Sequence, residues 1–152
     1  MTVIDRRAAR VLLVDPAGRA LLLHGGDPAR PGERWWFTPG GGLSGDETPA
    51  EGAARELAEE TGLRVTPAAL GQPVWHEVTE FSYRTQQIRQ DQDFFLLRVA
   101  DWQVDTAGMD EDEQQTITDH RWWSAAEIET SAEQIFPLDL AGLLRRLSGE
   151  AN

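Results

Sequence analysis

Residues 39–62 constrain the fold more than any other part of this sequence, because a run of glycines leads into a strongly marked helix. Thr48, Pro49 and Glu51 supply a capping Thr, a Pro at the first helical position and a Glu three residues after the cap. The residues that follow are rich in Ala, Glu and Leu, which favour helix. Gly62 is typical of the residue at which a helix ends. We therefore predict a helix between Pro49 and Gly62.

Three carboxylates share one face of this predicted helix. Glu56, Glu59 and Glu60 are spaced i, i+3 and i+4, so their side chains project from the same side. Carboxylates this close repel one another, and a hard divalent cation such as Mg²⁺ or Mn²⁺ relieves the repulsion. The glycines at 40–42 have no side chains, so their backbone can approach a metal ion or a phosphate closely. The pattern predicts a site for Mg²⁺, with Mn²⁺ as a second candidate.

Arg55 directly precedes the first of these carboxylates and follows Glu47 by eight residues. A guanidinium in this position can pair with Glu47. We expect this pair to tie the glycine-containing loop to the helix.

The combination resembles the Nudix box. That motif is a Gly, five residues, a Glu, seven residues, Arg-Glu, an aliphatic residue, any residue, Glu-Glu, any residue, a Gly and an aliphatic residue. The departure Ser44-Gly45-Asp46, where the family usually has an acidic residue and Pro-Gly, falls at variable positions. The fixed positions are all matched, by Gly41, Glu47, Arg55, Glu56, Leu57, Glu59, Glu60, Gly62 and Leu63.

The resemblance implies a pyrophosphohydrolase that cleaves a nucleoside diphosphate linked to another moiety, by attack of water on phosphorus. Within that class we expect a modified or surplus nucleoside triphosphate, cleaved to a monophosphate and pyrophosphate. The alternative is a non-catalytic Nudix-fold sensor that binds a nucleotide. Such sensors commonly lose the acidic residues of the box, and none is missing here.

The resemblance also implies roles for individual residues. The metal ion would be held by Glu59, Glu60 and the carbonyl of Gly40, while Glu56 would be a ligand or the general base. Arg55 and Glu47 would orient the loop and the helix of the box, which begins at Gly41.

The general base has a second candidate region, because some family members draw it from a loop outside the box. The acidic run Asp110–Glu113 is the natural place for it, and we select Glu113. The competing interpretation is that this run is only a solvated acidic loop. The choice between Glu56 and this run stays open at this point.

The aromatic pair just before the box suggests substrate contacts. Trp35 and Trp36 would point to opposite faces of a strand, so one would be core and the other could stack on a nucleobase. Core packing of both is an equally good interpretation. We select Trp36 and Arg34 as candidate substrate-binding residues. Other arginines could meet phosphates, although solvation at the surface is the default for this residue type: Arg6, Arg7 and Arg10.

The charge balance limits the classes of partner and of chemistry. There are 26 acidic and 14 basic residues, a net charge of −12, and every basic residue is Arg. Backbone binding to nucleic acid needs a basic face, so we expect a small nucleotide as partner. The absence of Cys and Lys excludes thiol nucleophiles and a Schiff-base lysine. A homodimer is compatible with these features.

The 152 residues suit one domain, 1–152. No apolar run reaches signal-peptide or membrane-helix length, so we expect a cytoplasmic protein without a membrane segment. Resemblance and element order together indicate an α/β (α+β) fold, a Nudix-type α/β/α sandwich. In it a mixed β-sheet carries the box helix on one side and C-terminal helices on the other. Expected strands cover 8–14, 20–23, 35–38, 73–83, 87–99 and 116–123, with irregular segments at 39–42 and 101–115 and helices after Ser124 and from Pro137.

Overall fold

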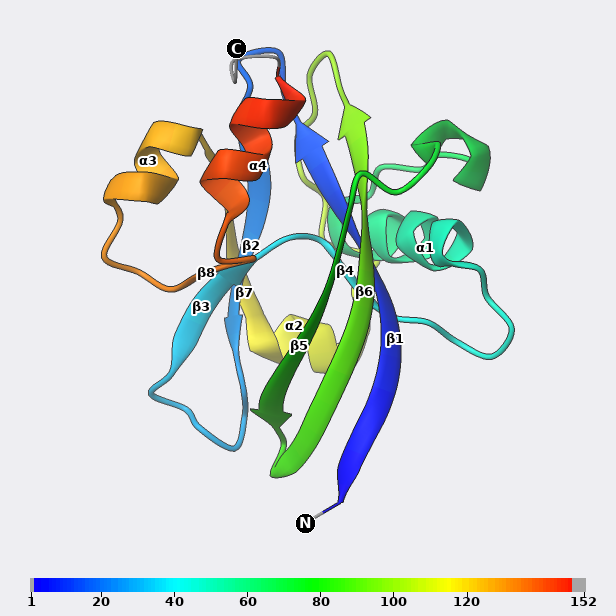
Figure 1. Ribbon diagram of the computed structural model, residues 1–152, viewed down its shortest axis with the longest axis vertical. Coiled ribbons are helices and arrows are strands. Elements are labelled where there is room, and N and C mark those ends of the chain that lie inside the picture. Colours follow the sequence, from blue (N-terminus) through cyan, green and yellow to red (C-terminus); the bar gives the residue numbers. More distant parts are fainter. Residues whose placement is uncertain (1, 149–152) are drawn as a thin grey trace.

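A computed structural model describes residues 2–148 of the chain, so the predicted domain range of 1–152 extends beyond the described residues at both ends. Its centre is a curled mixed sheet of eight strands with the order β5-β6-β1-β2-β3-β8, in which β4 pairs with β1 and β7 with β2 (Figure 1). The long β1 and β6 are parallel, and β5 and β6 form an antiparallel hairpin. The strands are β1 (Val3–Val14), β2 (Ala20–Gly26), β3 (Arg34–Phe37), β4 (Gly40–Gly42), β5 (Trp75–Tyr83), β6 (Gln86–Arg98), β7 (Ile117–Trp123) and β8 (Ile135–Phe136).

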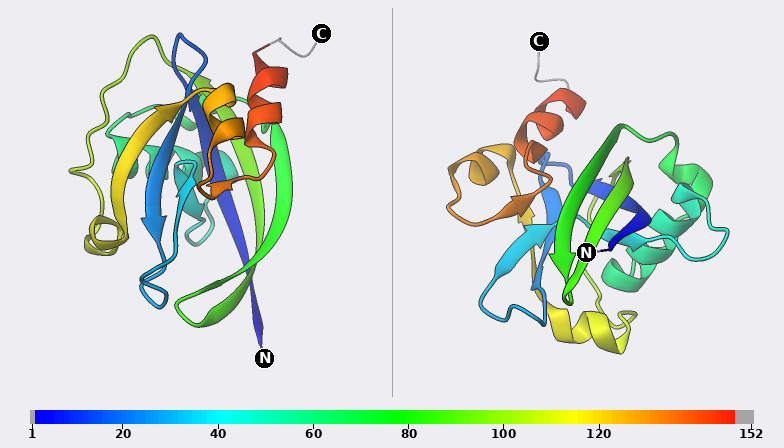
Figure 2. Two further views of the ribbon diagram at one scale, coloured as in Figure 1. Left: turned by 90° about the vertical axis from the view of Figure 1, so that its left-hand side faces the viewer. Right: turned by 60° about the horizontal axis from the view of Figure 1, so that its bottom comes forward.

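Helices cover both faces of this sheet, which confirms the predicted sandwich (Figures 1 and 2). On one face, α1 (Pro49–Thr61) buries Leu57 against Val11 and Leu13. On the other face, α3 (Ala125–Thr130) and α4 (Leu140–Leu147) pack over a core that includes Leu12. Because alternate residues of β1 point to opposite layers, the apolar run in its second half is buried on both sides. Within residues 2–148, no helix combines the length and the apolar character needed to cross a membrane.

The boundaries of α1 follow the predicted signals. The Thr48 hydroxyl accepts a hydrogen bond from the Glu51 N–H at 3.2 Å, and the Glu51 carboxylate accepts one from the Thr48 N–H at 2.9 Å. At the other end, Gly62 adopts φ 79°, which favours glycine, and donates its N–H to the Ala58 carbonyl. The helix is therefore fixed at both ends by local sequence.

Two segments that we predicted as irregular form regular structure. Gly40–Gly42 is the short strand β4, antiparallel to Ala8–Arg10, because the edge of β1 there is open for pairing. Within 101–115, Glu111–Thr116 forms a helix, α2, whose capping box joins Asp110 and Glu113. Both predictions were therefore wrong at these residues. The first was wrong because a long-range pairing with β1 makes the glycines a strand, and the second because a capping box begins a helix at Glu111.

The last helix begins later than predicted. Pro137 lies before it, and α4 starts at Leu140. Leu138, which also precedes the helix, is 85% exposed. Within the helix, Leu140, Leu143 and Leu144 are buried.

The curl of the sheet is closed by contacts between segments that are distant in the sequence (Figure 2). Asp27, in the loop after β2, is 3% exposed. Both of its carboxylate oxygens accept the Arg84 N–H, at 3.1 Å each, from the tight turn between β5 and β6. The Arg84 guanidinium also pairs with Asp112 on α2. This link joins the β5–β6 turn to the helix that carries Glu113.

Candidate active site

Arg55 is the organising side chain of the glycine-containing loop and α1. Its Nε and Nη2 donate to the two carboxylate oxygens of Glu47, at 2.7 and 3.0 Å, so the predicted pair is bidentate. Nη2 also donates to the Gly42 carbonyl at 3.2 Å. Nη1 donates to Glu56 at 2.8 Å and, at the longer distance of 3.4 Å, to Glu59. One guanidinium therefore ties the loop, β4 and two acidic residues of the helix together.

Glu47 is held in its ionised form by these contacts. Hydrogen bonds from Arg55 lower the pKa of the Glu47 carboxyl, and the Ser44 N–H donates to it as well. The pKa of Arg55 is raised by the same pair. The Glu47–Arg55 pair is thus a charged structural link between loop and helix.

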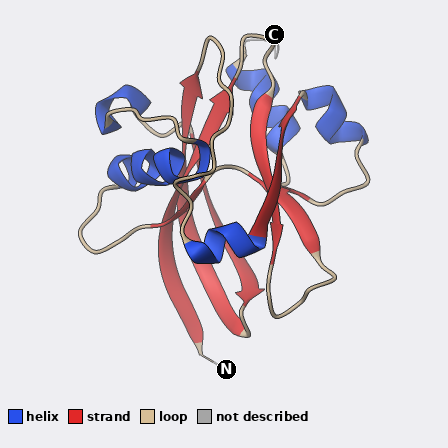
Figure 3. Ribbon diagram, turned by 180° about the vertical axis from the view of Figure 1, so that it is seen from behind, coloured by secondary structure: helices blue, strands red, loops and turns tan. Residues whose placement is uncertain are grey.

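Three carboxylates converge beside this link. One carboxylate oxygen each from Glu56, Glu59 and Glu113 lies within 4.8 Å of the others. Glu56 and Glu59 come from α1, whereas Glu113 comes from α2, which lies between α1 and the start of β7 when the molecule is seen from behind (Figure 3). The structure therefore brings the selected residue of the acidic run to the box carboxylates, across more than fifty residues of sequence.

Glu60 lies outside this group and is 2% exposed. Its Oε1 accepts the Gly40 N–H at 2.8 Å. Gly40 has φ 143°, and a Cβ there would come within 2.2 Å of the Ala9 carbonyl oxygen, so only glycine fits. The contact holds β4 against α1.

Burial dominates the titration of the two least exposed carboxyls. It raises the pKa of Glu56 to about 7, with further increases from the charges of Glu113 and Glu59 and an opposing hydrogen bond from Arg55. Burial and the charge of Glu56 raise the pKa of Glu60 well above its usual range, although the Gly40 N–H opposes this. Holding these groups as anions therefore costs free energy when no metal ion is bound.

This cost leads to a pH-dependent stability. We compare the free energy of unfolding of wild type with that of Glu56→Gln, both without divalent metal. Between pH 4 and pH 8.5, we expect wild type to lose about 3 kcal/mol more than the variant. The Glu56 pKa is about 7 in the folded protein and 4.5 as the reference value. The stabilisation is therefore complete below the unfolded pKa and lost as pH rises through the folded pKa. Urea unfolding in EDTA at several pH values measures it.

The exposed helix residue Glu51 provides the matched control for this measurement. Its substitution Glu51→Gln keeps a side chain that completes a capping box. The difference in free energy of unfolding between wild type and Glu51→Gln should stay constant with pH. A wild-type-minus-Glu56→Gln difference that is equally flat would contradict the expectation.

The donor set fits a hard divalent cation. Oxygen-only ligands are typical of Mg²⁺ and Mn²⁺ sites in proteins. Within the described residues 2–148, Arg55 is the cation that forms salt bridges with the carboxylate group, and two of its nitrogens are committed to Glu47. The excess negative charge at Glu56, Glu59 and Glu113 is what a bound metal ion would balance.

The two predicted substrate contacts on β3 have different surroundings. Trp36 is 5% exposed and packs in the core, with its ring stacked on His24 at 4.4 Å and edge-on to Trp123 at 5.2 Å. This burial favours core packing over stacking on a nucleobase as the role of Trp36. Arg34 is exposed, and its Nη2 donates to the Thr118 hydroxyl. Trp35, on the alternate face, is half-buried.

Sequence reasoning missed two buried amides on β6. Gln90 and Gln92 are 2% and 7% exposed and share a sheet face with the core residue Phe94. No local signal marks them, because residues 89–93 are all polar and show no alternation that would predict one buried face. Each accepts a hydrogen bond from an arginine of β1.

Comparison with known proteins places the chain. A family model described as NUDIX domain matches residues 5–146. Among solved structures, the MutT protein of Methanosarcina mazei Go1 has a TM-score of 0.62 at 21% identity, covering 99% of this chain and 97% of that one. An Ap4A hydrolase of C. elegans has 0.56 at 19%, covering 95% and 96%. A bifunctional NMN adenylyltransferase/ADP ribose pyrophosphatase of Francisella tularensis has 0.62 at 20%, covering 97% of this chain and 42% of that one.

Proposed function

This chain belongs to the Nudix family of hydrolases, which cleave phosphoric anhydride bonds, and we propose that its substrate is a modified or surplus nucleoside triphosphate. In this proposal, Mg²⁺-dependent attack of water on phosphorus yields a nucleoside monophosphate and pyrophosphate. The whole chain would act as one Nudix domain.

One observation carries the proposal. Carboxylate oxygens of Glu56, Glu59 and Glu113 lie within 4.8 Å of one another, beside a guanidinium that already has a partner in Glu47. Structural packing alone gives no reason to gather three like charges from two helices. A divalent cation that also binds a phosphate chain accounts for the arrangement, because its positive charge balances the carboxylates and it prefers oxygen ligands.

The proposed roles follow from the surroundings of each residue. Glu59 and Glu56 would hold the metal ion together with Glu60 and the Gly40 carbonyl, and Arg55 would keep Glu56 and the loop in position. When bound, Mg²⁺ neutralises charge on phosphate oxygens and lowers the pKa of water. Glu113 would accept the proton of the attacking water, because its carboxylate is half-buried and touches no guanidinium among residues 2–148.

The named activities of similar structures support a nucleotide substrate. Ap4A and ADP-ribose each contain a nucleoside diphosphate joined to a further group, and proteins named for these compounds share the fold. Most of this chain is the shared fold, and 97% of the MutT protein is covered as well. A nucleoside triphosphate also contains a nucleoside diphosphate joined to a further group, and we propose this class as the substrate.

The test is a substrate panel with Mg²⁺, with Mn²⁺ and with EDTA. Canonical and modified nucleoside triphosphates, dinucleoside polyphosphates and ADP-ribose are incubated separately, and phosphate is read after coupling to pyrophosphatase or phosphatase. We expect metal-dependent turnover that is highest with one or a few triphosphates. Turnover only of ADP-ribose or dinucleoside polyphosphates would contradict the substrate assignment, while keeping the hydrolase class. Binding without any product, measured by calorimetry, would favour the sensor alternative.

A further inference from the structure

Two arginines of β1 point to the inner face of the curled sheet and are held there by amides. Arg6 Nε donates to Gln90 Oε1 at 2.7 Å, and Arg10 Nε donates to Gln92 Oε1 at 3.3 Å. The two amides are themselves linked, since Gln90 Nε2 donates to Gln92 Oε1 at 2.9 Å. The register of parallel β1 and β6 places Arg6 directly beside Gln90. The result is a continuous polar ladder across two strands.

The ladder holds positive charge without neutralising it. An amide oxygen accepts a guanidinium hydrogen bond but carries no net charge. Within residues 2–148, neither Arg6 nor Arg10 forms a salt bridge, and the terminal nitrogens of Arg6 have no hydrogen-bond partner. Both terminal nitrogens of Arg6 are accessible to solvent, because the Trp123 indole nitrogen is the one fully buried side-chain atom without a partner within residues 2–148. Arg10 Nη1 donates to the neutral Thr38 carbonyl at 3.2 Å, so Arg6 has the freer guanidinium and neither arginine has an ion-pair partner, in a protein with a net charge of −12.

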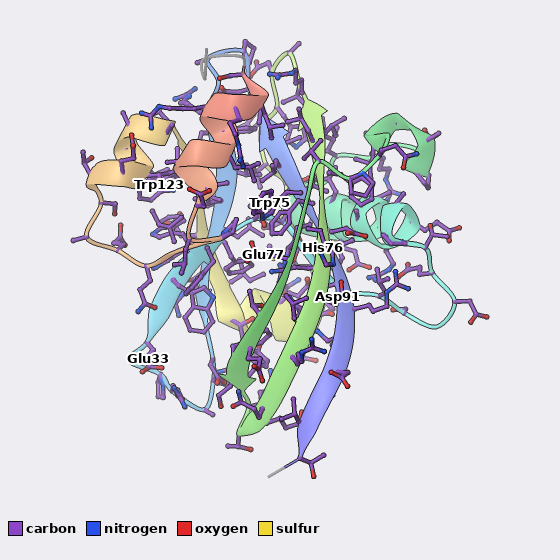
Figure 4. All side chains as sticks on the ribbon, viewed as in Figure 1. Glu33, Trp75, His76, Glu77, Asp91 and Trp123 are labelled. Atoms are coloured by element: carbon purple, nitrogen blue, oxygen red, sulfur yellow. The ribbon has the colours of Figure 1, made fainter. Side chains whose placement is uncertain are left out.

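Acidic side chains are also present on this face, but they leave the arginines unpaired. Glu77 of β5 points to the inside of the curl together with Trp75, whereas His76 points outward to Asp91 (Figure 4). The Glu77 carboxylate accepts the Trp75 indole N–H at 3.3 Å. The inner face therefore offers hydrogen-bond donors at its β1 side, nearest to β4.

The glycine strand β4 separates these cations from the carboxylates by the thickness of one backbone. A Cβ on Gly41 would lie 3.1 Å from the Glu56 carboxyl carbon. A Cβ on Gly42 would lie 3.3 Å from Cδ and 3.4 Å from Nε of Arg6, and one on Gly40 would lie 2.8 Å from Cδ of Arg10. Because alternate residues of a strand face opposite ways, the acidic and basic groups flank the same three residues. A phosphate chain at this strand would meet both.

We propose that Arg6 and Arg10 bind phosphate oxygens of the substrate that face away from the carboxylate group, and that Gln90 and Gln92 position the two guanidiniums. The inference rests on the proposed function, and it adds the residues that distinguish a polyphosphate from a monophosphate. Arg6 offers both terminal nitrogens, which suits bidentate contact to a phosphate. The amides hold the guanidiniums in place, so little freedom is lost when phosphate binds.

Arg7 provides a matched control on the same strand. Its side chain alternates to the opposite face and is exposed. Substituting it by Met changes the net charge by the same amount as the substitution of Arg6 or Arg10. Any effect of overall charge on anion binding is therefore common to all three variants.

The experiment measures binding of inorganic tripolyphosphate by titration calorimetry in the presence of Mg²⁺. We expect Arg6→Met and Arg10→Met each to weaken binding about tenfold or more, since a hydrogen bond between charged groups contributes roughly that factor. Arg7→Met should bind as wild type does. Dissociation constants in Arg6→Met and Arg10→Met that equal the Arg7→Met value overturn the inference.

An isosteric variant separates charge from packing. Gln92→Glu keeps the shape of the side chain but pairs a carboxylate with Arg10, and we expect tripolyphosphate binding to weaken about tenfold with thermal stability retained. In turnover of the best triphosphate, KM should rise by a similar factor while kcat changes less than about threefold. Unchanged KM and binding in this variant contradict the role of Arg10. A wild type that binds tripolyphosphate through Arg6 but hydrolyses no nucleotide contradicts the proposed function instead.

Discussion

Glu59→Gln is expected to lower kcat/KM by about a thousandfold. In the proposed site, Glu59 is a metal ligand, and a metal ion stabilises the charge of the transition state by several kcal/mol. A thousandfold loss of rate corresponds to about 4 kcal/mol of that stabilisation. The substitution preserves size and removes one negative charge. Glu59 is partly exposed and touches Arg55 only at 3.4 Å, so its loss should not disturb the fold. The measurement is steady-state turnover of the best triphosphate at several Mg²⁺ concentrations.

A metal-ligand role also predicts how the defect responds to metal. Removing a ligand weakens metal binding, so part of the lost rate should return when Mg²⁺ is raised or replaced by Mn²⁺. Glu51→Gln changes an exposed carboxylate of the same helix, outside the carboxylate group, and should keep wild-type kinetics. A Glu59→Gln variant with wild-type kcat/KM and an unchanged Mn²⁺ affinity would rule out this assignment.

The box helix could be predicted in detail because its information is local. Thr48, Glu51 and Gly62 act on backbone groups within a few residues, so the sequence alone determines where the helix begins and ends. The pairing of Arg55 with Glu47 was predictable for the same reason, since loop and helix are adjacent in the chain. The side of the sheet covered by each helix came from the family resemblance rather than from these local signals.

Features that depend on long-range pairing were not accessible in this way. The glycines 40–42 look like a break in the sequence, yet they form β4 because Ala8–Arg10 offers an open edge. Gln90 and Gln92 look like exposed strand residues, yet they are buried because Arg6 and Arg10 satisfy them. Trp36 could equally have been core or surface, and only the packing of His24 and Trp123 decides.

The position of Glu113 combines both kinds of information. Asp110 and Glu113 have the spacing of a capping box, which sequence could have identified as the start of a helix. Its approach to Glu56 requires the fold, because α1 and α2 come from distant parts of the chain and only the tertiary structure brings their carboxylates together. An acidic run alone does not indicate a site. Proximity to two other carboxylates separates Glu113 from its neighbours in the run.

Glu113→Gln is expected to lower kcat by about 10²- to 10⁴-fold, the usual contribution of a general base, with a smaller change in KM. Glutamine cannot accept the proton of the attacking water but fills the same volume. In wild type, kcat should fall as pH decreases, because a protonated base is inactive. This dependence should disappear in Glu113→Gln. Its measurement is the pH profile of kcat at saturating substrate and Mg²⁺.

Glu56→Gln is the decisive comparison, because Glu56 was the other candidate for the base. If Glu113 is the base, Glu56→Gln loses rate through weaker metal binding, and its remaining activity still falls at low pH. If Glu56 is the base instead, the acid limb disappears in Glu56→Gln and persists in Glu113→Gln. Glu111→Gln alters an exposed carboxylate two residues away on α2 and should match wild type in both rate and profile. The variant that loses its acid limb therefore identifies the residue that takes the proton.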